Sequence, residues 1–358
     1  MKKIAYIFLF LIFLSPTFLY GQDSVKSFKG TVEKIFEVPC SETFEEEYVC
    51  FEYLVKVKER EESVRTIPSM ADGNESKFVV GDRVYVAYST NDFESESWSI
   101  TGFVREGSIL TILIIFSIVA VLVGRRQGLG SLISLAITVF LLYLWAIPKI
   151  LGGGDVIFIG VVTVCISLVS IMYISHGFNM KSNISVFSTL VGIVIVALLA
   201  KLFISMVRID GSGSEEAFLL FSQTGGNIDL SAVFFVSILI GAMGVLDDVV
   251  MSQVSAIKEL YIANPTLSRT KLFSQSMNIG RDHLSSMVNT LFIAYAGSSF
   301  ALVMLLTYNS GGIGNILQAD VIAEEIVRTL SASIGILLIV PITSFIAAHL
   351  ISLDRSKS

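Results

Sequence analysis

Residues 230–250 read LSAVFFVSILIGAMGVLDDVV, and this stretch decides which kind of protein the chain encodes. No charged residue precedes Asp247 in it, so as a helix its apolar part covers roughly 26 Å at about 1.5 Å per residue. The hydrocarbon core of a bilayer is about 30 Å thick. We interpret the stretch as a membrane-spanning helix with Asp247 and Asp248 near one end of the span.

The composition extends this interpretation to most of the chain. Of 358 residues 53% are hydrophobic and only 16% are charged, against roughly 25% charged in ordinary soluble domains. This balance excludes a disordered or disulfide-dense secreted protein and argues against a soluble enzyme. We expect an all-α polytopic bundle of seven transmembrane helices, at Ile109–Gly124, Leu129–Ile147, Val156–Ile174, Ile184–Met206, Leu230–Val250, Met287–Tyr308 and Leu330–Leu350.

A different pattern precedes the bundle. Residues 1–21 have a basic start and an apolar run, which indicates a signal peptide or an uncleaved N-terminal membrane anchor. Residues 22–107 alternate apolar and polar side chains in short runs, as at Phe28–Val38 and Tyr48–Val57. Phe78–Tyr88 reads as a strand, a Gly-Asp turn and a second strand, and Ser97–Val104 as another. We predict a small β-rich barrel or sandwich at 22–107, the membrane domain at 108–352 and a short tail at 353–358.

Charge and cysteine usage separate these two parts further. Residues 22–107 hold 18 Asp/Glu and 10 Lys/Arg, whereas the rest of the chain is slightly basic. If this acidic segment is exported, Cys40 and Cys50 are candidates for a disulfide bond, and the alternative is two free thiols. No basic stripe suited to nucleic acid occurs.

The basic residues also predict an orientation. With residue 22 outside, the segments that fall inside carry 11 Lys/Arg and the outside connectors beyond the β-rich part carry three, Lys149, Arg208 and Arg328. Cytoplasmic loops are enriched in such residues. We therefore expect a bacterial inner-membrane protein with residues 22–107 extracytoplasmic and the C-terminus cytoplasmic.

The candidate site lies at the inner ends of the fifth and sixth spans. Asp247 and Asp248 come from one span, and Asn278, Arg281, Asp282 and Asn289 belong to the start of the other. A charge within hydrocarbon costs about 2.5–3.5 kcal/mol on insertion scales, which makes such residues functional candidates. A carboxylate pair facing an arginine suits ion or proton coupling. The alternatives are that the carboxylates are simply hydrated and that Arg281 is a positive-inside anchor.

Three further features have structural explanations. Gly241 and Gly244 form a small-residue face that permits close helix packing, and Gly297 is a third candidate for such packing. Ser276 or Asn278 is expected to cap the sixth span. Lys201 lies near the outer end of the fourth span, where its long stem can reach the interface.

The sequence offers no support for soluble catalysis. It has no P-loop and no G-x-S-x-G, and its three histidines lie in three different segments. Asp247 and Asp248 lack the Tyr-Asp and Gly-x-Gly-Asp settings of intramembrane aspartyl proteases. We therefore expect no enzyme, no cofactor and no metal site.

At these residues the chain resembles the YibE/F-like family of bacterial multi-pass membrane proteins. The stretches that carry the resemblance are Gly124–Leu129, Gly241–Ser252, Asn278–Asp282, Asn289–Gly297 and Gly335–Ser344. In the family pattern the acid after Gly-Ala-x-Gly corresponds to Asp248, and Asp247 departs from that pattern. The resemblance implies an integral membrane protein of permease-like character and supplies no substrate or catalytic residue.

Two functions follow as hypotheses. The first is a transporter or permease for a small solute or ion, with the lipid bilayer and that solute as partners. The second is a non-transporting scaffold or signalling protein whose β-rich domain binds an extracytoplasmic ligand, protein or membrane partner. Flux measurements in vesicles separate the two.

Overall fold

A computed structural model describes residues 26–39, 49–57, 62–66, 69–70, 77–90, 96–310 and 318–353. The predicted signal peptide or anchor at 1–21, Cys40 and the tail beyond 353 lie outside these residues. The chain divides into two compact units at Val119/Ala120. Each unit is described by itself.

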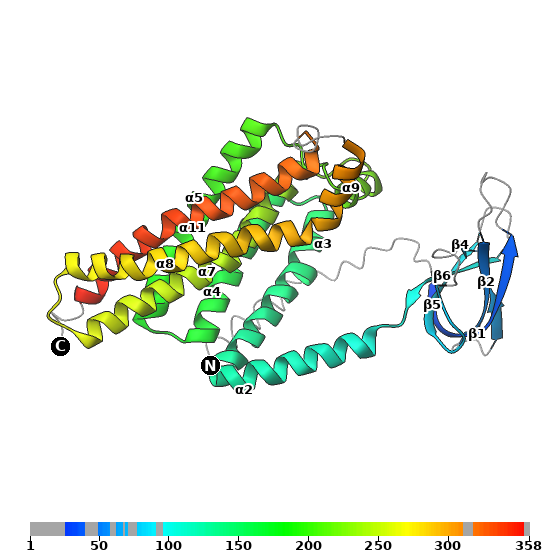
Figure 1. Ribbon diagram of the computed structural model, residues 1–358, viewed down its shortest axis with the longest axis horizontal. Coiled ribbons are helices and arrows are strands. Elements are labelled where there is room, and N and C mark those ends of the chain that lie inside the picture. The colour runs from blue at the N-terminus through cyan, green and yellow to red at the C-terminus, as the bar shows by residue number, and fades with distance from the viewer. Residues whose placement is uncertain are drawn as a thin grey trace. The chain divides into compact units, whose positions relative to one another are not determined.

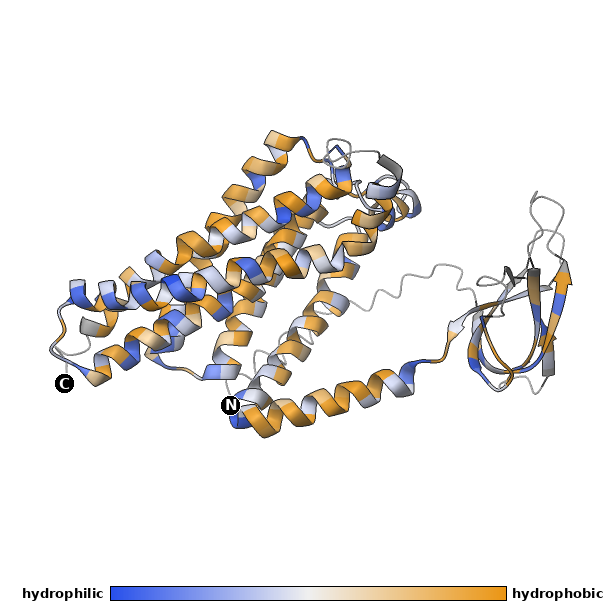
Figure 2. Cartoon of the chain, viewed as in Figure 1, coloured by the Kyte–Doolittle hydropathy of each residue, from blue (hydrophilic) through white to orange (hydrophobic). Residues whose placement is uncertain are grey.

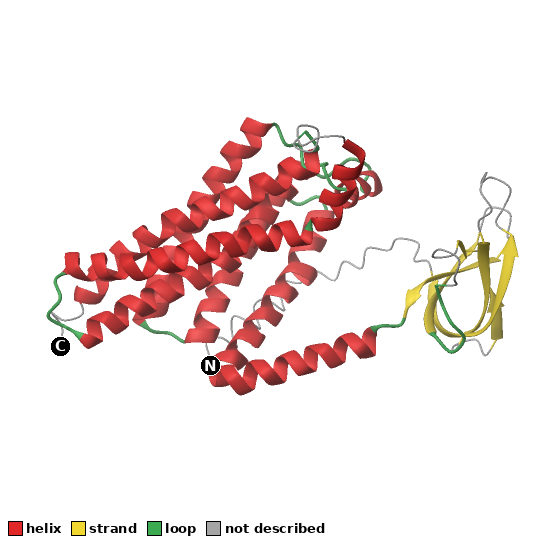
Figure 3. Cartoon of the chain, viewed as in Figure 1, coloured by secondary structure: helices red, strands yellow, loops and turns green. Residues whose placement is uncertain are grey.

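The first unit holds one antiparallel sheet, shown in yellow in Figure 3. The strands hydrogen-bond in the order β3-β2-β1-β5-β6, and β4 pairs with β2. Strand bounds are β1 Lys26–Pro39, β2 Val49–Val57, β3 Glu62–Arg65, β4 Ser69–Met70, β5 Arg83–Thr90 and β6 Glu96–Phe103. The predicted β-rich domain is confirmed as a single curved sheet (Figure 1), and the described strands show neither a second sheet nor a β3–β6 pairing that would close a barrel.

Alternation of side chains explains the core of this sheet. Tyr53, Val55 and Val57 on β2 and Val84 and Val86 on β5 are all almost fully buried, because every second residue of a strand points to the same face. β1 serves two partners: it pairs with β5 through Lys26–Thr31 and with β2 from Gly30 onward, with an irregularity in register near residue 33.

The turn before β5 and the cysteine of β2 bear on two of the predictions for this unit. Phe78–Val80 is not a strand, and the chain instead turns there through Gly81, whose φ is +98°. Asp82 accepts the Val79 N–H at 2.8 Å and holds that turn. Cys50 is buried and disulfide-bonded, whereas Cys40, the partner that the sequence predicts, lies outside the described residues.

Glu106 ties the start of α2 to the sheet. Its carboxylate accepts hydrogen bonds from Lys29 Nζ at 2.6 Å and from the Tyr85 hydroxyl. The bond with Glu106, and after it an interaction with Tyr85, raises the pKa of Lys29 above its ordinary value.

The second unit is helical (Figure 1). Its helices are the later part of α2 (Glu106–Phe140), a π-helical segment η1 (Leu141–Ala146), α3 (Ile147–Leu151), α4 (Val156–His176), α5 (Met180–Val207), α6 (Glu215–Gln223), α7 (Leu230–Ala263), α8 (Arg269–Ser298), α9 (Phe300–Ser310) and α11 (Asp320–Leu353). Most of their residues are apolar, as the orange colouring in Figure 2 shows. Such helices match a lipid environment, because side chains exposed to hydrocarbon need not be polar.

The described residues contain five helices long and apolar enough to cross a membrane, or six if the bent pair α8 and α9 forms one span. α8 and α9 meet at an angle of 61° near Ser299. The first candidate, Glu106–Leu151, has 46 residues and departs from helical geometry at Arg125, where φ is 50° and ψ is −126°. The sequence expects a loop between two spans at this point, and the count of seven stays a prediction.

Helix starts follow local capping chemistry. Side-chain oxygens of Asp155, Asn179, Asp229 and Ser268 accept the N–H three residues on and begin α4, α5, α7 and α8 respectively. The prediction that Ser276 or Asn278 caps the sixth span is therefore wrong, because the helix starts seven residues or more before them, at Arg269.

α7 is longer than the predicted fifth span, which ends at Val250, and continues without a break to Ala263. The helix ends before Asn264-Pro265, since a proline disfavours helical geometry in the residue that precedes it.

α7 lies at the centre of the helical unit and packs on α4, α5, α8 and α11. Glycine allows close approaches between helices: an added Cβ would lie 2.4 Å from Val236 at Gly160 and 2.8 Å from Val340 at Gly280. At Gly241 the nearest such atom is the Tyr295 hydroxyl, 3.4 Å away, and at Gly244 and Gly297 nothing lies within 4 Å. The close packing predicted at Gly244 and Gly297 is not seen in the described part of the chain.

Candidate functional site

Asp247 is a carboxylate enclosed by packed helices. Only 8% of the residue is exposed, and its neighbours along α7, Leu246 and Val250, are completely buried. Its Oδ1 has no hydrogen-bond partner among the described residues. An ionised carboxylate without a partner is costly to bury. The position of Asp247 is therefore unfavourable for the charged form of its side chain.

Hydroxyl groups of α5 accompany the stretch of α7 around Asp247. Ser185 Oγ lies 3.7 Å from Met251 Sδ, and an added Cβ at Gly192 would lie 3.3 Å from Leu246 Cδ1. The two helices therefore run antiparallel. Asp247 lies between the Ser185–Met251 contact and the Gly192–Leu246 contact along α7. Ser188 and Thr189 occupy the corresponding stretch of α5, are fully buried, and have hydroxyls without a partner among the described residues.

Asp248 has a different environment from Asp247. It is exposed and interacts electrostatically with His176, the last residue of α4, and with His283 on α8. The structure thus brings together two histidines that the sequence places in unrelated segments. No group of three or more His, Cys, Asp or Glu with a geometry suited to a metal ion occurs among the described residues.

The candidate residues of α8 lie on its exposed side. Asn278, Arg281, Asp282 and Asn289 are all exposed, whereas the buried side of the helix consists of Leu272, Ser276, Gly280, Leu284 and Leu291. Neither Arg281 nor Asp282 takes part in the three ion pairs found among the described residues. The direct pairing of Arg281 with a carboxylate of α7 stays a prediction.

A buried polar junction escaped the sequence interpretation. Gln253 is 4% exposed and donates from Nε2 to Ser276 O at 2.9 Å and to Ser344 Oγ at 2.7 Å, so it joins α7, α8 and α11. Its spacing from Asp247 gives no signal, since residues six apart on an α-helix lie about 120° apart around the helix axis. Nothing in the sequence identifies its two partners.

The opposite end of α7 also carries charged residues. Arg328 of α11 donates to Ser237 Oγ at 3.1 Å and lies over the Phe234 ring at 5.2 Å. Glu324, 6% exposed, accepts the Gly213 N–H at 2.9 Å and so holds the loop after α5 against α11. The sequence interpretation missed both residues because it began the last span at Leu330, ten residues after the helix actually starts.

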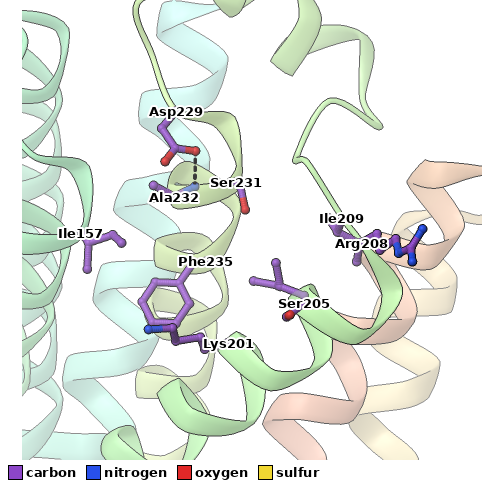
Figure 4. A pocket seen from close by; sticks show the side chains of 10 residues that line it. Ile157, Lys201, Ser205, Arg208, Ile209, Asp229, Ser231, Ala232 and Phe235 are labelled. Atoms are coloured by element: carbon purple, nitrogen blue, oxygen red, sulfur yellow. Dashed lines mark hydrogen bonds between the residues drawn. The ribbon is translucent and has the colours of Figure 1, made fainter.

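A pocket opens at this same end, between α4, α5 and α7. It encloses about 570 Å³. Its apolar lining comes from Ile157, Ile204, Ile209, Ala232 and Phe235. Figure 4 shows its polar side chains, Lys201, Ser205, Arg208, Asp229 and Ser231, and the hydrogen bond from Ala232 N–H to Asp229.

Long apolar helices with polar groups enclosed between them define a membrane protein. The model of the YibE/F-like protein family matches residues 112–353, most of the helical unit. The chain belongs to the YibE/F-like family. Neither the curated proteins nor the solved structures contain a match to it.

Proposed function

We propose that the protein is a permease of the bacterial inner membrane, which moves a small solute or ion and uses Asp247 as its coupling carboxylate. One observation carries this proposal: a carboxylate that is 8% exposed, with one oxygen unpartnered, lies between helices of membrane-spanning length. A structural scaffold gains nothing from such a group, because an apolar residue would pack there without the cost of burying charge.

The surroundings of Asp247 suit the passage of a cation or a proton. Hydroxyls of Ser188 and Thr189 are acceptors for a partly dehydrated cation and relay groups for a proton. Asp248, which interacts electrostatically with His176 and His283, adds titratable groups next to the buried carboxylate. The polar side of α8, with Asn278, Arg281, Asp282 and Asn289, completes the gate that we propose.

The proposed topology has seven spans. Residues 106–151 would extend roughly 69 Å as one straight helix, more than twice the hydrocarbon thickness of about 30 Å. Division at Arg125 gives two spans of ordinary length, and α8 with α9 supplies one more. The excess of Lys and Arg in the alternate connections supports a cytoplasmic C-terminus and an extracytoplasmic sheet.

Charge movement in proteoliposomes tests the proposal. Wild-type protein on a solid-supported membrane is exposed to concentration jumps of protons, Na⁺, K⁺, Mg²⁺ and small organic acids and amines. We expect a transient current with at least one of these, absent from protein-free vesicles and from Asp247→Asn. Asp320→Asn, which changes an exposed carboxylate at the other end of the bundle, is the matched control and should keep the current.

The scaffold hypothesis predicts the opposite result. Folded wild-type protein would then give no current with any member of the panel, or Asp247→Asn would leave an observed current unchanged. Either result would remove Asp247 from the proposed role. Thermal unfolding of each variant in detergent separates loss of function from loss of fold.

A further inference from the structure

The pocket at the N-terminal end of α7 has well-defined walls. Arg208, at its rim, ends α5 in a left-handed conformation, with φ of 62° and ψ of 43°. Three residues later, the φ of +85° at Gly211 lets the chain pass directly against the backbone of Leu230, where any Cβ would collide. Glu324 then fixes Gly213. The loop that bounds the pocket is therefore held on both sides.

Two cations, Lys201 and Arg208, and one acid, Asp229, line this pocket. Lys201 and Arg208 take part in none of the ion pairs among the described residues. Lys201 precedes the end of α5 by six residues, about 9 Å along the helix. Lys201 is exposed, so its ammonium group is accessible to an external anion that enters the pocket.

Each nearby carboxylate accepts hydrogen bonds from the loop or from the start of a helix. Asp229 accepts the Ala232 N–H at 3.0 Å and caps α7. Asp210 accepts from the Ser212 N–H and hydroxyl at 2.9 and 2.8 Å, and these bonds lower the pKa of the Asp210 carboxyl. Glu324 accepts a hydrogen bond from the Gly213 N–H at 2.9 Å. The three acids stabilise the loop and the helix start, and none of them forms an ion pair with Lys201 or Arg208 among the described residues.

We propose that this pocket binds an amphiphilic organic anion, whose carboxylate or phosphate pairs with Lys201, with Arg208 as a second cation at the rim, and whose apolar part rests on Phe235 and Ile209. The hydroxyls of Ser205 and Ser231 are additional donors to the same anionic group (Figure 4). A volume of about 570 Å³ is within the usual range for small-molecule sites. The anion has two natural sources, the headgroup of an acidic lipid and a free amphiphile, and transport by the bundle is not required for either.

Dansylaminoundecanoate, a fluorescent fatty carboxylate, is a suitable probe. We would titrate it into full-length protein in phosphatidylcholine nanodiscs and subtract the signal of empty nanodiscs. Saturable binding is expected, and Lys201→Met should weaken it about tenfold or more, the effect of losing one charged hydrogen bond. Lys201→Arg should retain binding. Lys149→Met, which removes a cation held over the Trp145 ring and outside the pocket, should bind as the wild type does.

Competition experiments distinguish an acidic lipid from a free amphiphilic anion. They also give the results that would contradict the proposal. Displacement by phosphatidylglycerol in the nanodisc but not by octanoate assigns the site to an acidic lipid, and the reverse result assigns it to a free anion; both support the proposal. Displacement by decanol as effective as by decanoate would show an apolar pocket only. That result, absence of saturable binding, or equal affinity in folded Lys201→Met would overturn the proposal.

Discussion

At the scale of single residues, the bundle combines tight contacts with a few enclosed polar groups. Gln253 satisfies its amide by bonding to Ser276 and Ser344, whereas Asp247 keeps an oxygen without a partner. Both lie on α7, so the same helix carries a polar group that fixes structure and one that has no structural use. This contrast is the reason for assigning function to Asp247 and a packing role to Gln253.

The contact at Gly280 gives a prediction for stability. A Cβ there would lie 2.8 Å from Val340 Cγ1 and 3.0 Å from Gln253 Oε1, so Gly280→Ala should overpack the junction and lower the free energy of unfolding by about 1–3 kcal/mol. Gly244→Ala is the matched control on α7, because nothing lies within 4 Å of its added Cβ. Thermal unfolding in detergent measures both. Equal stability of the two variants would show that the three helices do not meet as described.

At the scale of elements, the decisive feature is the break in α2. The helix leaves its regular path at Arg125, and an added Cβ at Gly128 would collide with the backbone of Ala120. The backbone just before the break, at Ala120, therefore packs closely against the backbone just after it, at Gly128. The π-helical turns at Leu141–Ala146 directly precede Pro148, which lacks the N–H that a regular helix would use.

Labelling of cysteines tests whether this break separates two spans. In a cysteine-free background, Arg126→Cys should react with a membrane-impermeant maleimide from the cytoplasmic side. Lys149→Cys should react only from the other side, because one full span would lie between them. Reaction of both positions from the same side would contradict the seven-span topology.

Sequence reasoning located most elements and few of their contacts. Alternation identified β1, β2, β5 and β6, and hydropathy identified every long helix, because both patterns record which side chains leave water. Hydropathy could not predict that α7 continues to Ala263 or that α8 starts at Arg269, since helices extend beyond the hydrocarbon while apolar composition does not. The pairing of Gln253 with Ser344 and the approach of His176 to Asp248 depend on tertiary packing, which one sequence does not encode locally.

At the scale of the whole molecule, the sheet and the bundle are distinct compact units. The sheet has its own core around Val55 and Val84, both fully buried. The start of α2 is tied to it through Glu106. This independence indicates that the sheet can fold without the bundle.

A fragment of residues 22–107 should therefore fold alone. We expect cooperative thermal unfolding and a β-type circular dichroism spectrum under non-reducing conditions. Val55→Asp should abolish both, because it would place an unpaired charge in the core, whereas the exposed-residue change Lys34→Asp should not. A fragment that stays unfolded while the full chain is folded would show that the sheet depends on the bundle.

The most direct measurement of the central claim, that Asp247 couples transport, is modification by dicyclohexylcarbodiimide, which reacts with carboxyl groups sheltered from water. Mass spectrometry should locate the adduct on Asp247 rather than on the exposed Asp248 or Asp320, and the current in proteoliposomes should fall in proportion to labelling. An unlabelled Asp247, or a fully labelled protein whose current is unchanged, would contradict the account.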